Sequence, residues 1–211
     1  KNAIKITQKN FPETIQLGDV RQITKNSLPK VWLLSSGSPC QDLSMMGKRK
    51  GICTKRGKVI TTLEQYLELK EKGTQFQGQS YLFWEFIRLL RELKPKYFFF
   101  ENVKMPDEWF YIISRELRQL PLKVNSSLVS AQNRERYYWT NIPDVTVPKD
   151  KGITISDIIP EAKSGYGIRG RLNNLSGKYI PTGTARKDCK ANCLVTSKST
   201  TTKILLKNGK I

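Results

Sequence analysis

One cysteine stands where the chain could present a nucleophile. Cys40 lies in the stretch Gly37-Ser38-Pro39-Cys40-Gln41, directly after an apolar run at residues 31–34 that predicts a buried strand. Ligands of open α/β sheets bind at the carboxyl ends of the strands, and a thiolate placed there can attack a substrate. Because an isolated cysteine is more often a small core residue, its interpretation depends on the rest of the chain.

A carboxyl group and two guanidinium groups occupy comparable places further along the chain. An apolar run at residues 97–100, typical of a strand covered on both faces, leads directly into Glu101-Asn102-Val103. The segment Gln132-x-Arg134-x-Arg136 follows, between two further strand patterns. Burying a carboxylate at the end of a covered strand costs free energy unless the carboxylate is paired or has a functional role. We therefore expect Cys40 and Glu101 to share one pocket.

Helical patterns separate these strands, so the chain is expected to form an α/β sheet. Residues 1–10 predict a helix, and Thr62-Leu63-Glu64-Gln65 is a capping box that begins another near residue 63. Ser80 is expected to cap the next helix, which ends before Pro95, and Pro106 opens a further one. The helix after Ser80 carries an apolar stripe that we interpret as core packing: Leu82, Phe83, Phe86, Ile87, Leu89, Leu90 and Leu93.

A shorter pattern precedes the Cys40 strand. Residues 15–20 alternate in the manner of a strand and include Asp19. On its own, this carboxylate is better explained as a loop cap than as a ligand for a hydroxyl or amine.

The charge balance points to a polyanionic partner. The 211 residues include 37 Lys and Arg against 18 Asp and Glu, which gives a net charge of +19. Residues 43–63 hold no acidic side chain and carry the basic run Lys48, Arg49 and Lys50 in a glycine-containing loop, which we expect to contact phosphates. No apolar run approaches the length of a membrane span. With four cysteines and no histidine, a metal site is not expected.

The amino-acid composition of the chain changes after Pro143. Residues 161–211 are rich in Gly, Ser, Thr, Asn and Lys and hold eleven basic residues against two acidic ones. Short β-like pieces occur at residues 193–196 and 204–206. This composition predicts a small, basic, β- and loop-rich module instead of a disordered tail.

Pro39-Cys40-Gln41, Glu101-Asn102-Val103 and Gln132-x-Arg134-x-Arg136, taken together and in this order, resemble the C5-cytosine DNA methyltransferase family of phage and prokaryotic type. The resemblance implies an incomplete Rossmann-like S-adenosylmethionine-dependent methyltransferase sheet. It places a partial catalytic domain at residues 1–142 and a partial target recognition region at residues 143–211. Residues 186–197 are similar to segments of phage-type and prokaryotic members.

The family's catalytic roles transfer to individual positions. Cys40 matches the nucleophile that adds to C6 of cytosine, and Glu101 matches the acid that bonds N3 and the exocyclic amine. Arg134 matches the arginine that bonds the O2 oxygen, while Arg136 and Gln132 complete that motif and brace the pocket. Neither Cys40 nor Glu101 could reach a base inside a duplex, so the target nucleotide must be flipped out.

The resemblance also implies the methyl donor S-adenosylmethionine as cofactor. Asp19 matches the aspartate near its adenine, and Val20, Pro39 and Leu82 are expected on the cofactor side. Double-stranded DNA is the expected partner, with contacts from Gln132 and from the basic residues Lys48, Arg49, Lys50, Arg186 and Lys187. A cognate restriction endonuclease is a further expected partner, and the cytoplasm of a bacterial or phage-infected cell the expected location.

Some of the family's features are absent from the sequence. These are the first strand with its Phe-x-Gly-x-Gly loop, the acidic residue after the second strand, and the closing motif that returns to the cofactor. We therefore expect the chain to be the middle of a longer enzyme or one part of a split one. Two alternatives stay open: an RNA-directed methyltransferase built on this fold, and a non-catalytic homologue that binds nucleic acid.

Overall fold

The computed structural model describes residues 2–44, 51–172, 179–192 and 202–208. Lys48, Arg49 and Lys50, and the β-like piece expected at residues 193–196, lie outside these ranges. Two compact units make up the chain: Lys1–Phe100, Met105–Gln119 and Trp139–Ile142 form the first, and Glu101–Lys104, Leu120–Tyr138 and Pro143–Ile211 form the second. The catalytic and target-recognition boundary expected at residue 142 stays a prediction.

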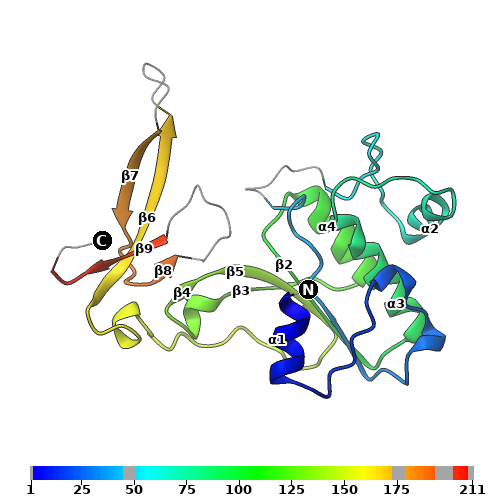
Figure 1. Ribbon diagram of the computed structural model, residues 1–211, viewed down its shortest axis with the longest axis horizontal. Coiled ribbons are helices and arrows are strands. Elements are labelled where there is room, and N and C mark those ends of the chain that lie inside the picture. The colour runs from blue at the N-terminus through cyan, green and yellow to red at the C-terminus, as the bar shows by residue number, and fades with distance from the viewer. Residues whose placement is uncertain (1, 45–50, 173–178, 193–201, 209–211) are drawn as a thin grey trace. The chain divides into compact units, whose positions relative to one another are not determined.

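The first unit contains the helices that the sequence patterns predicted. Its α-helices are α1 (Asn2–Asn10), α2 (Leu63–Glu71), α3 (Phe83–Leu93) and α4 (Asp107–Leu117), and its short 3-10 helices are η1 (Val20–Gln22), η2 (Lys25–Ser27) and η3 (Ser80–Leu82) (Figure 1). Helix α2 begins as the capping box requires, because the Thr62 side chain accepts a hydrogen bond from the Gln65 amide at 3.2 Å. Among the described residues, no helix is both long enough and apolar enough to span a bilayer.

An open four-stranded sheet has the order β1 (Leu33–Ser36), β2 (Tyr97–Asn102), β5 (Glu135–Thr140) and β3 (Leu122–Asn125). Strands β1 and β2 are parallel neighbours, and their register places Ser36 opposite Phe100. Strands β3 and β5 are antiparallel. Helices α2 and α3 intervene between β1 and β2 in sequence, so the predicted α/β class is confirmed.

Aromatic side chains join α3 to the sheet in the core of the first unit. Phe86 stacks on Phe100 with ring centroids 5.1 Å apart, and Phe83 meets the same ring edge-on at 5.4 Å. Trp139 of β5 lies 5.7 Å from Phe100 and donates its indole N–H to Ser114 Oγ at 2.9 Å. The indole therefore buries its apolar body without leaving its N–H unpaired.

Three local expectations were wrong. Residues 15–20 form no strand, since they lead through a loop into η1, and Ile15 is 81% exposed. The strand expected to be buried is β1, the edge of the four-stranded sheet, where Leu33 is 42% exposed. Ser80 caps no helix, because its hydroxyl bonds to the backbone of a distant segment instead.

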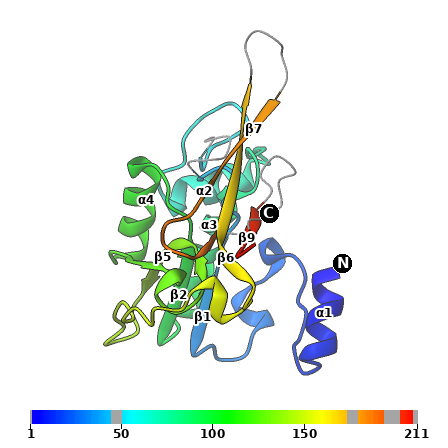
Figure 2. The same cartoon turned by 90° about the vertical axis from the view of Figure 1, so that its left-hand side faces the viewer.

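The second unit is rich in strands, as the composition of its C-terminal part predicted. Strand β6 (Ala162–Leu172) pairs antiparallel with β7 (Tyr179–Ala185) and with β9 (Thr202–Leu206) (Figures 1 and 2). A separate short pair joins β4 (Gln132–Asn133) to β8 (Ala191–Asn192) in parallel. The remaining elements are the 3-10 helices η4 (Ser126–Leu128) and η5 (Ile155–Asp157).

Candidate active site

Cys40 lies in a tight turn after β1. Its carbonyl oxygen accepts the amides of Leu43 at 3.1 Å and Ser44 at 2.8 Å, so the chain turns immediately behind the thiol. The cysteine is partly buried and forms no disulfide. Because β1 and β2 are parallel, the turn follows the carboxyl end of β1, and Glu101 lies at the carboxyl end of β2. Their sharing of one pocket stays a prediction.

Glu101 lies between the two arginines of the Gln132-x-Arg134-x-Arg136 segment, and all of these residues belong to the second unit. Its Oε1 atom is 3.0 Å from Arg136 Nε and 3.8 Å from Arg134 Nη2. The Arg136 contact is a charge pair and not a hydrogen bond, since Nε has no acceptor in hydrogen-bonding geometry. The Glu101 side chain stays 28% exposed. The acid and both arginines thus face one region of space, as the motif order predicted.

The backbone around Arg134 is fixed by polar residues of the same unit. The Arg134 amide donates to Asn125 Oδ1 at 2.9 Å, and its carbonyl accepts the Ser126 amide at 3.0 Å. Ser126 Oγ also donates to the Gln132 carbonyl at 2.8 Å. Strand β4 is held from its other side by β8, which places Ala191 opposite Gln132.

Lys190, one of the basic residues that suggested a polyanion-binding module, is buried instead. Its ammonium donates to the carbonyl oxygens of Ser127 at 2.7 Å, of Ser130 at 3.4 Å, and of Ile153. These contacts tie the segment before Gln132 to the strand β8 that pairs with it. Three carbonyl acceptors satisfy all three donors of the ammonium, so the charge is stabilised inside the fold.

We expect Lys190→Met to loosen the segment that leads to Arg134. Methionine keeps an apolar stem but leaves the carbonyls without their donor, and each unpaired buried group costs about 1–3 kcal/mol. Hydrogen exchange of the peptide covering residues 125–136 should therefore accelerate. Lys187→Met, at an exposed neighbouring lysine, should leave that exchange unchanged. Equal exchange rates in the two variants would contradict the bracing role.

Three residues expected on the cofactor side line one cavity of the first unit. The cavity has a volume of about 250 Å³, and Val20, Pro39 and Leu82 contribute to its wall. The other lining residues are Leu34, Ser35, Ser36, Gly37, Ser38, Phe86 and Leu89. Leu82, Phe86 and Leu89 belong to the stripe interpreted as core packing, so that stripe also forms part of a cavity wall. Small-molecule sites usually enclose roughly 300 Å³ or more, so the volume of this cavity suits only part of such a ligand.

Asp19 does not line this cavity. Its carboxylate accepts the Arg21 amide at 2.9 Å, which caps η1 as the loop-cap interpretation predicted. The Arg21 guanidinium bonds the same carboxylate at 2.5–3.0 Å. Hydrogen bonds from the Arg21 side chain, and then from its amide, lower the pKa of Asp19 from 3.8 to about 2. Its role beside an adenine stays a prediction.

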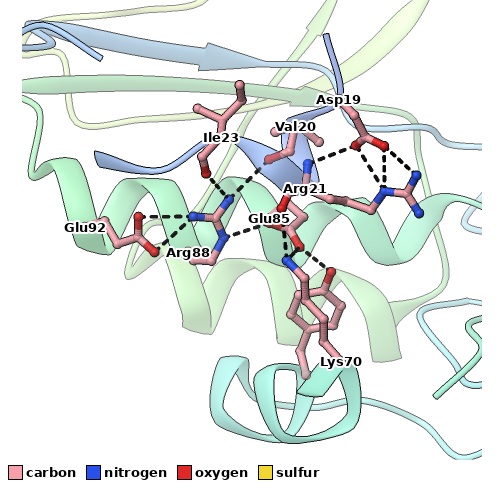
Figure 3. A network of polar contacts seen from close by, with 9 residues as sticks. Asp19, Val20, Arg21, Ile23, Lys70, Glu85, Arg88 and Glu92 are labelled. Atoms are coloured by element: carbon pink, nitrogen blue, oxygen red, sulfur yellow. Dashed lines mark hydrogen bonds and ion pairs between the residues drawn. The ribbon is translucent and has the colours of Figure 1, made fainter. Parts of the chain in front are cut away.

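A buried ionic network reaches the backbone of Val20, one of the residues that line the cavity (Figure 3). Glu85 is fully buried and accepts hydrogen bonds from Tyr66 at 2.5 Å, Lys70 at 2.6 Å and Arg88 at 2.7 Å. Arg88 also donates to the carbonyl oxygens of Val20 at 3.2 Å and Ile23 at 2.7 Å. The network therefore connects α2 and α3 to η1, the element that begins at Val20.

Burial opposes ionisation of Glu85 more than any other single influence. The hydrogen bonds from Lys70, Tyr66 and Arg88 together outweigh it, so the pKa of Glu85 lies below its ordinary value. Sequence reasoning missed this network. The sequence feature that could have indicated the network is the i, i+3 spacing of Glu85 and Arg88. In the structure, residues 83–89 of that helix are all buried.

The residues expected to contact DNA fall into different surroundings. Gln132 lies in β4, and Arg186 forms an ion pair with Asp188, whose Oδ1 accepts from Arg186 Nε at 2.9 Å. Lys187 is exposed. DNA contact by these three residues stays a prediction.

Comparison with known proteins gives consistent results. A family model for C-5 cytosine-specific DNA methylases matches residues 1–207. The orphan methyltransferase M.Rho11sI of Bacillus phage rho11s is 29% identical over 155 residues, which cover 68% of this chain and 26% of that protein. The type II methyltransferase M.BsuFI of Bacillus subtilis is 28% identical over 192 residues, which cover 82% of this chain and 41% of that protein.

Among solved structures, a chain described as a prophage-encoded DNA modification methyltransferase (E. coli) is similar, with a TM-score of 0.45 and 21% identity. The match covers 71% of this chain and 42% of that one. The chain thus spans less than half the length of these relatives. Since the family model matches nearly the whole sequence, the chain belongs to the C-5 cytosine-specific DNA methylase family.

Proposed function

We propose that the protein containing this chain is a DNA (cytosine-5-)-methyltransferase that transfers a methyl group from S-adenosylmethionine to a flipped cytosine. The observation that carries the proposal is the family match over residues 1–207, which includes the Cys40, Glu101 and Arg134 motifs. The family, C-5 cytosine-specific DNA methylases, supports DNA as the substrate. The names of the relatives, orphan and type II methyltransferases of Bacillus and its phages, support methyl transfer. The proposed setting is the cytoplasm of a bacterial or phage-infected cell.

The proposed chemistry begins at the base, because C5 of cytosine is a poor nucleophile. The Cys40 thiolate adds to C6 while Glu101 acts as an acid at N3, and the electron density at C5 then resembles that of an enamine. C5 takes the methyl group, a water molecule accepts the C5 proton, the C6–S bond breaks to return the thiolate, and N3 gives its proton back to Glu101. Atoms and charge balance without an oxidant or reductant.

The Glu101 surroundings support a single site in which the acid and the arginines contact the base. Arg134 and Arg136 both reach the carboxyl group, and Arg134 keeps 41% of its side chain exposed, which leaves it accessible to a ligand. We propose that Arg134 bonds the O2 oxygen of the base and that Arg136, with Gln132, holds the pocket in shape. The partly exposed Glu101 is proposed to bond N3 and the exocyclic amine.

The cavity around Val20, Pro39 and Leu82 supports the choice of cofactor. Its apolar side chains and small serines would hold the flat ring of S-adenosylmethionine, with Asp19 proposed nearby. When bound, this cofactor supplies an electrophilic methyl group. The chain's own contribution is a wall shared with the cysteine turn, since Pro39 belongs to both.

Methyl transfer with three substrates tests the proposal. The intact protein is incubated with methyl-labelled S-adenosylmethionine and either unmodified duplex DNA, the same duplex with every cytosine replaced by 5-methylcytosine, or structured RNA. Label is expected in the unmodified duplex alone. Label in the premethylated duplex would contradict C5 as the acceptor, and label in RNA would favour the RNA-directed alternative. DNA binding without transfer to any substrate would favour the non-catalytic homologue.

A further inference from the structure

A buried serine holds the cysteine turn from both sides. Ser80 is fully buried, and its hydroxyl donates to the Pro39 carbonyl at 2.7 Å. The same oxygen accepts the Asp42 amide at 3.3 Å. One side chain thus bonds to the residue before Cys40 and to the residue two places after it. All of these residues lie in the first unit.

The residues before Ser80 reinforce this contact. The Asp42 carboxylate is buried and accepts the Gln79 amide at 3.2 Å. Gly78 has a φ of +60°, and a Cβ at this position would lie 2.0 Å from Asp42 Oδ2. Only a glycine lets the backbone approach the carboxylate so closely, because any side chain would push Asp42 away. The segment from Gly78 to Ser80 is therefore shaped to receive the turn.

The same segment leads directly into the cavity wall. Ser80 begins η3, which contains Leu82, and Leu82 and Pro39 both line the cavity of about 250 Å³. The Ser80 hydroxyl therefore connects two parts of that wall, one of which carries Cys40. A displacement of either part would be transmitted to the other through the hydrogen bonds of Ser80 to Pro39 and Asp42.

We propose that Ser80 is a positioning residue that fixes the Cys40 turn relative to the adjoining cavity. It touches no reacting atom and acts through the Pro39 carbonyl and the Asp42 amide. Its catalytic consequence rests on the proposed function, because only a reaction at the thiol would sense the position of the turn. The geometric part of the proposal is independent of that function.

Alkylation of the four cysteines separates local loosening from general instability. The intact protein and its Ser80→Ala variant are treated with iodoacetamide, and modification of each cysteine is followed by peptide mass spectrometry. Cys53 is the internal reference, since it is buried, and burial, followed by the charges of Glu108 and Asp42, raises the pKa of its thiol. We expect Ser80→Ala to raise the alkylation rate of Cys40 at least about threefold relative to that of Cys53, because access of the reagent limits the alkylation of a partly buried thiol.

Thr62→Ala is the matched control. It removes the side-chain cap of α2, a hydrogen bond to Gln65, without touching the Cys40 turn. Its ratio of Cys40 to Cys53 alkylation should equal that of the unmodified protein. Gly78→Ala, which displaces Asp42 without altering Ser80, should raise the Cys40 alkylation rate relative to that of Cys189, the reference for this variant because Asp42 also influences Cys53.

Steady-state kinetics provides the second readout. We expect Ser80→Ala to lower kcat several-fold with little change in the KM for DNA, because the variant misplaces the nucleophile and leaves DNA contacts intact. A Cys40 to Cys53 ratio unchanged in Ser80→Ala, or a parallel rise at both cysteines, would overturn the positioning role. Absence of methyl transfer by the unmodified protein would refute the proposed function instead, and would leave the alkylation result valid.

Discussion

Replacing Cys40 by serine is expected to lower methyl transfer to DNA by about a thousandfold or more, the size of effect that follows loss of a covalent nucleophile. Serine has nearly the same shape as cysteine, but its hydroxyl is a far weaker nucleophile than a thiolate. The turn around it should persist, because its hydrogen bonds come from the backbone and from Ser80. DNA binding should accordingly be retained.

A covalent complex with modified DNA makes this prediction specific to the Cys40 sulfur. In duplex DNA that carries 5-fluorocytosine, C5 can take a methyl group but cannot release fluorine as a cation, so the C6–S bond persists. The unmodified protein should form a complex that survives denaturing electrophoresis, and Cys40→Ser should form none. Cys189→Ser, at a cysteine of the second unit, should behave as the unmodified protein does. Retained turnover in Cys40→Ser would reject the nucleophile assignment.

Features that depend on a few neighbouring residues could be predicted from the sequence. Thr62 and Gln65 begin α2 because a hydroxyl three residues before an amide can satisfy it locally. Pro106 directly precedes α4 for a similarly local reason, since proline lacks an N–H that the start of a helix would leave unpaired. The gathering of Glu101, Arg134 and Arg136 was implied by the family resemblance, which depends on three short motifs in order.

Features that depend on distant partners could not be predicted in this way. Ser80 has the local surroundings of a helix cap, but its hydroxyl hydrogen-bonds instead to the backbone carbonyl of Pro39, 41 residues away. Lys190 belongs to a segment with the composition of a basic surface. Its ammonium group nevertheless points inward, because carbonyl groups from residues 127, 130 and 153 converge on it. Nothing in the residues beside Ser80 or Lys190 encodes those partners.

The strand expected at residues 15–20 failed for a related reason. An alternating pattern forms a strand only where a neighbouring strand pairs with it, and among the described strands none pairs with this segment. The segment is instead attached through η1, whose Val20 carbonyl accepts from Arg88. Helix α3 therefore determines the position of Val20, and through it part of the cavity wall.

Glu85→Gln is expected to give the largest loss of stability. Glutamine has nearly the same volume, but it removes the negative charge that Lys70 and Arg88 share inside the protein. Removing one partner of a buried ion pair typically costs about 3–5 kcal/mol. The loss should lie at the lower end of that range, because Lys70 is 33% exposed and Arg88 keeps its ion pair with Glu92. Urea unfolding followed by the fluorescence of the buried Trp84 and Trp139 measures the loss. Near pH 7 the urea concentration at the unfolding midpoint should be lower for Glu85→Gln than for the unmodified protein.

The pH dependence provides an internal check on this prediction. The pKa of Glu85 is lower in the folded protein than its ordinary value near 4.5, so its contribution is present above that value and disappears as the pH falls through the folded pKa. The difference between the unmodified protein and Glu85→Gln should thus be large near pH 7 and shrink as the pH falls below that ordinary value. Glu68→Gln, which breaks an exposed pair with Lys72 on α2, should leave the midpoint unchanged. A Glu85→Gln loss that is small or independent of pH would show that the ionised carboxylate does not stabilise the connection between α2, α3 and Val20.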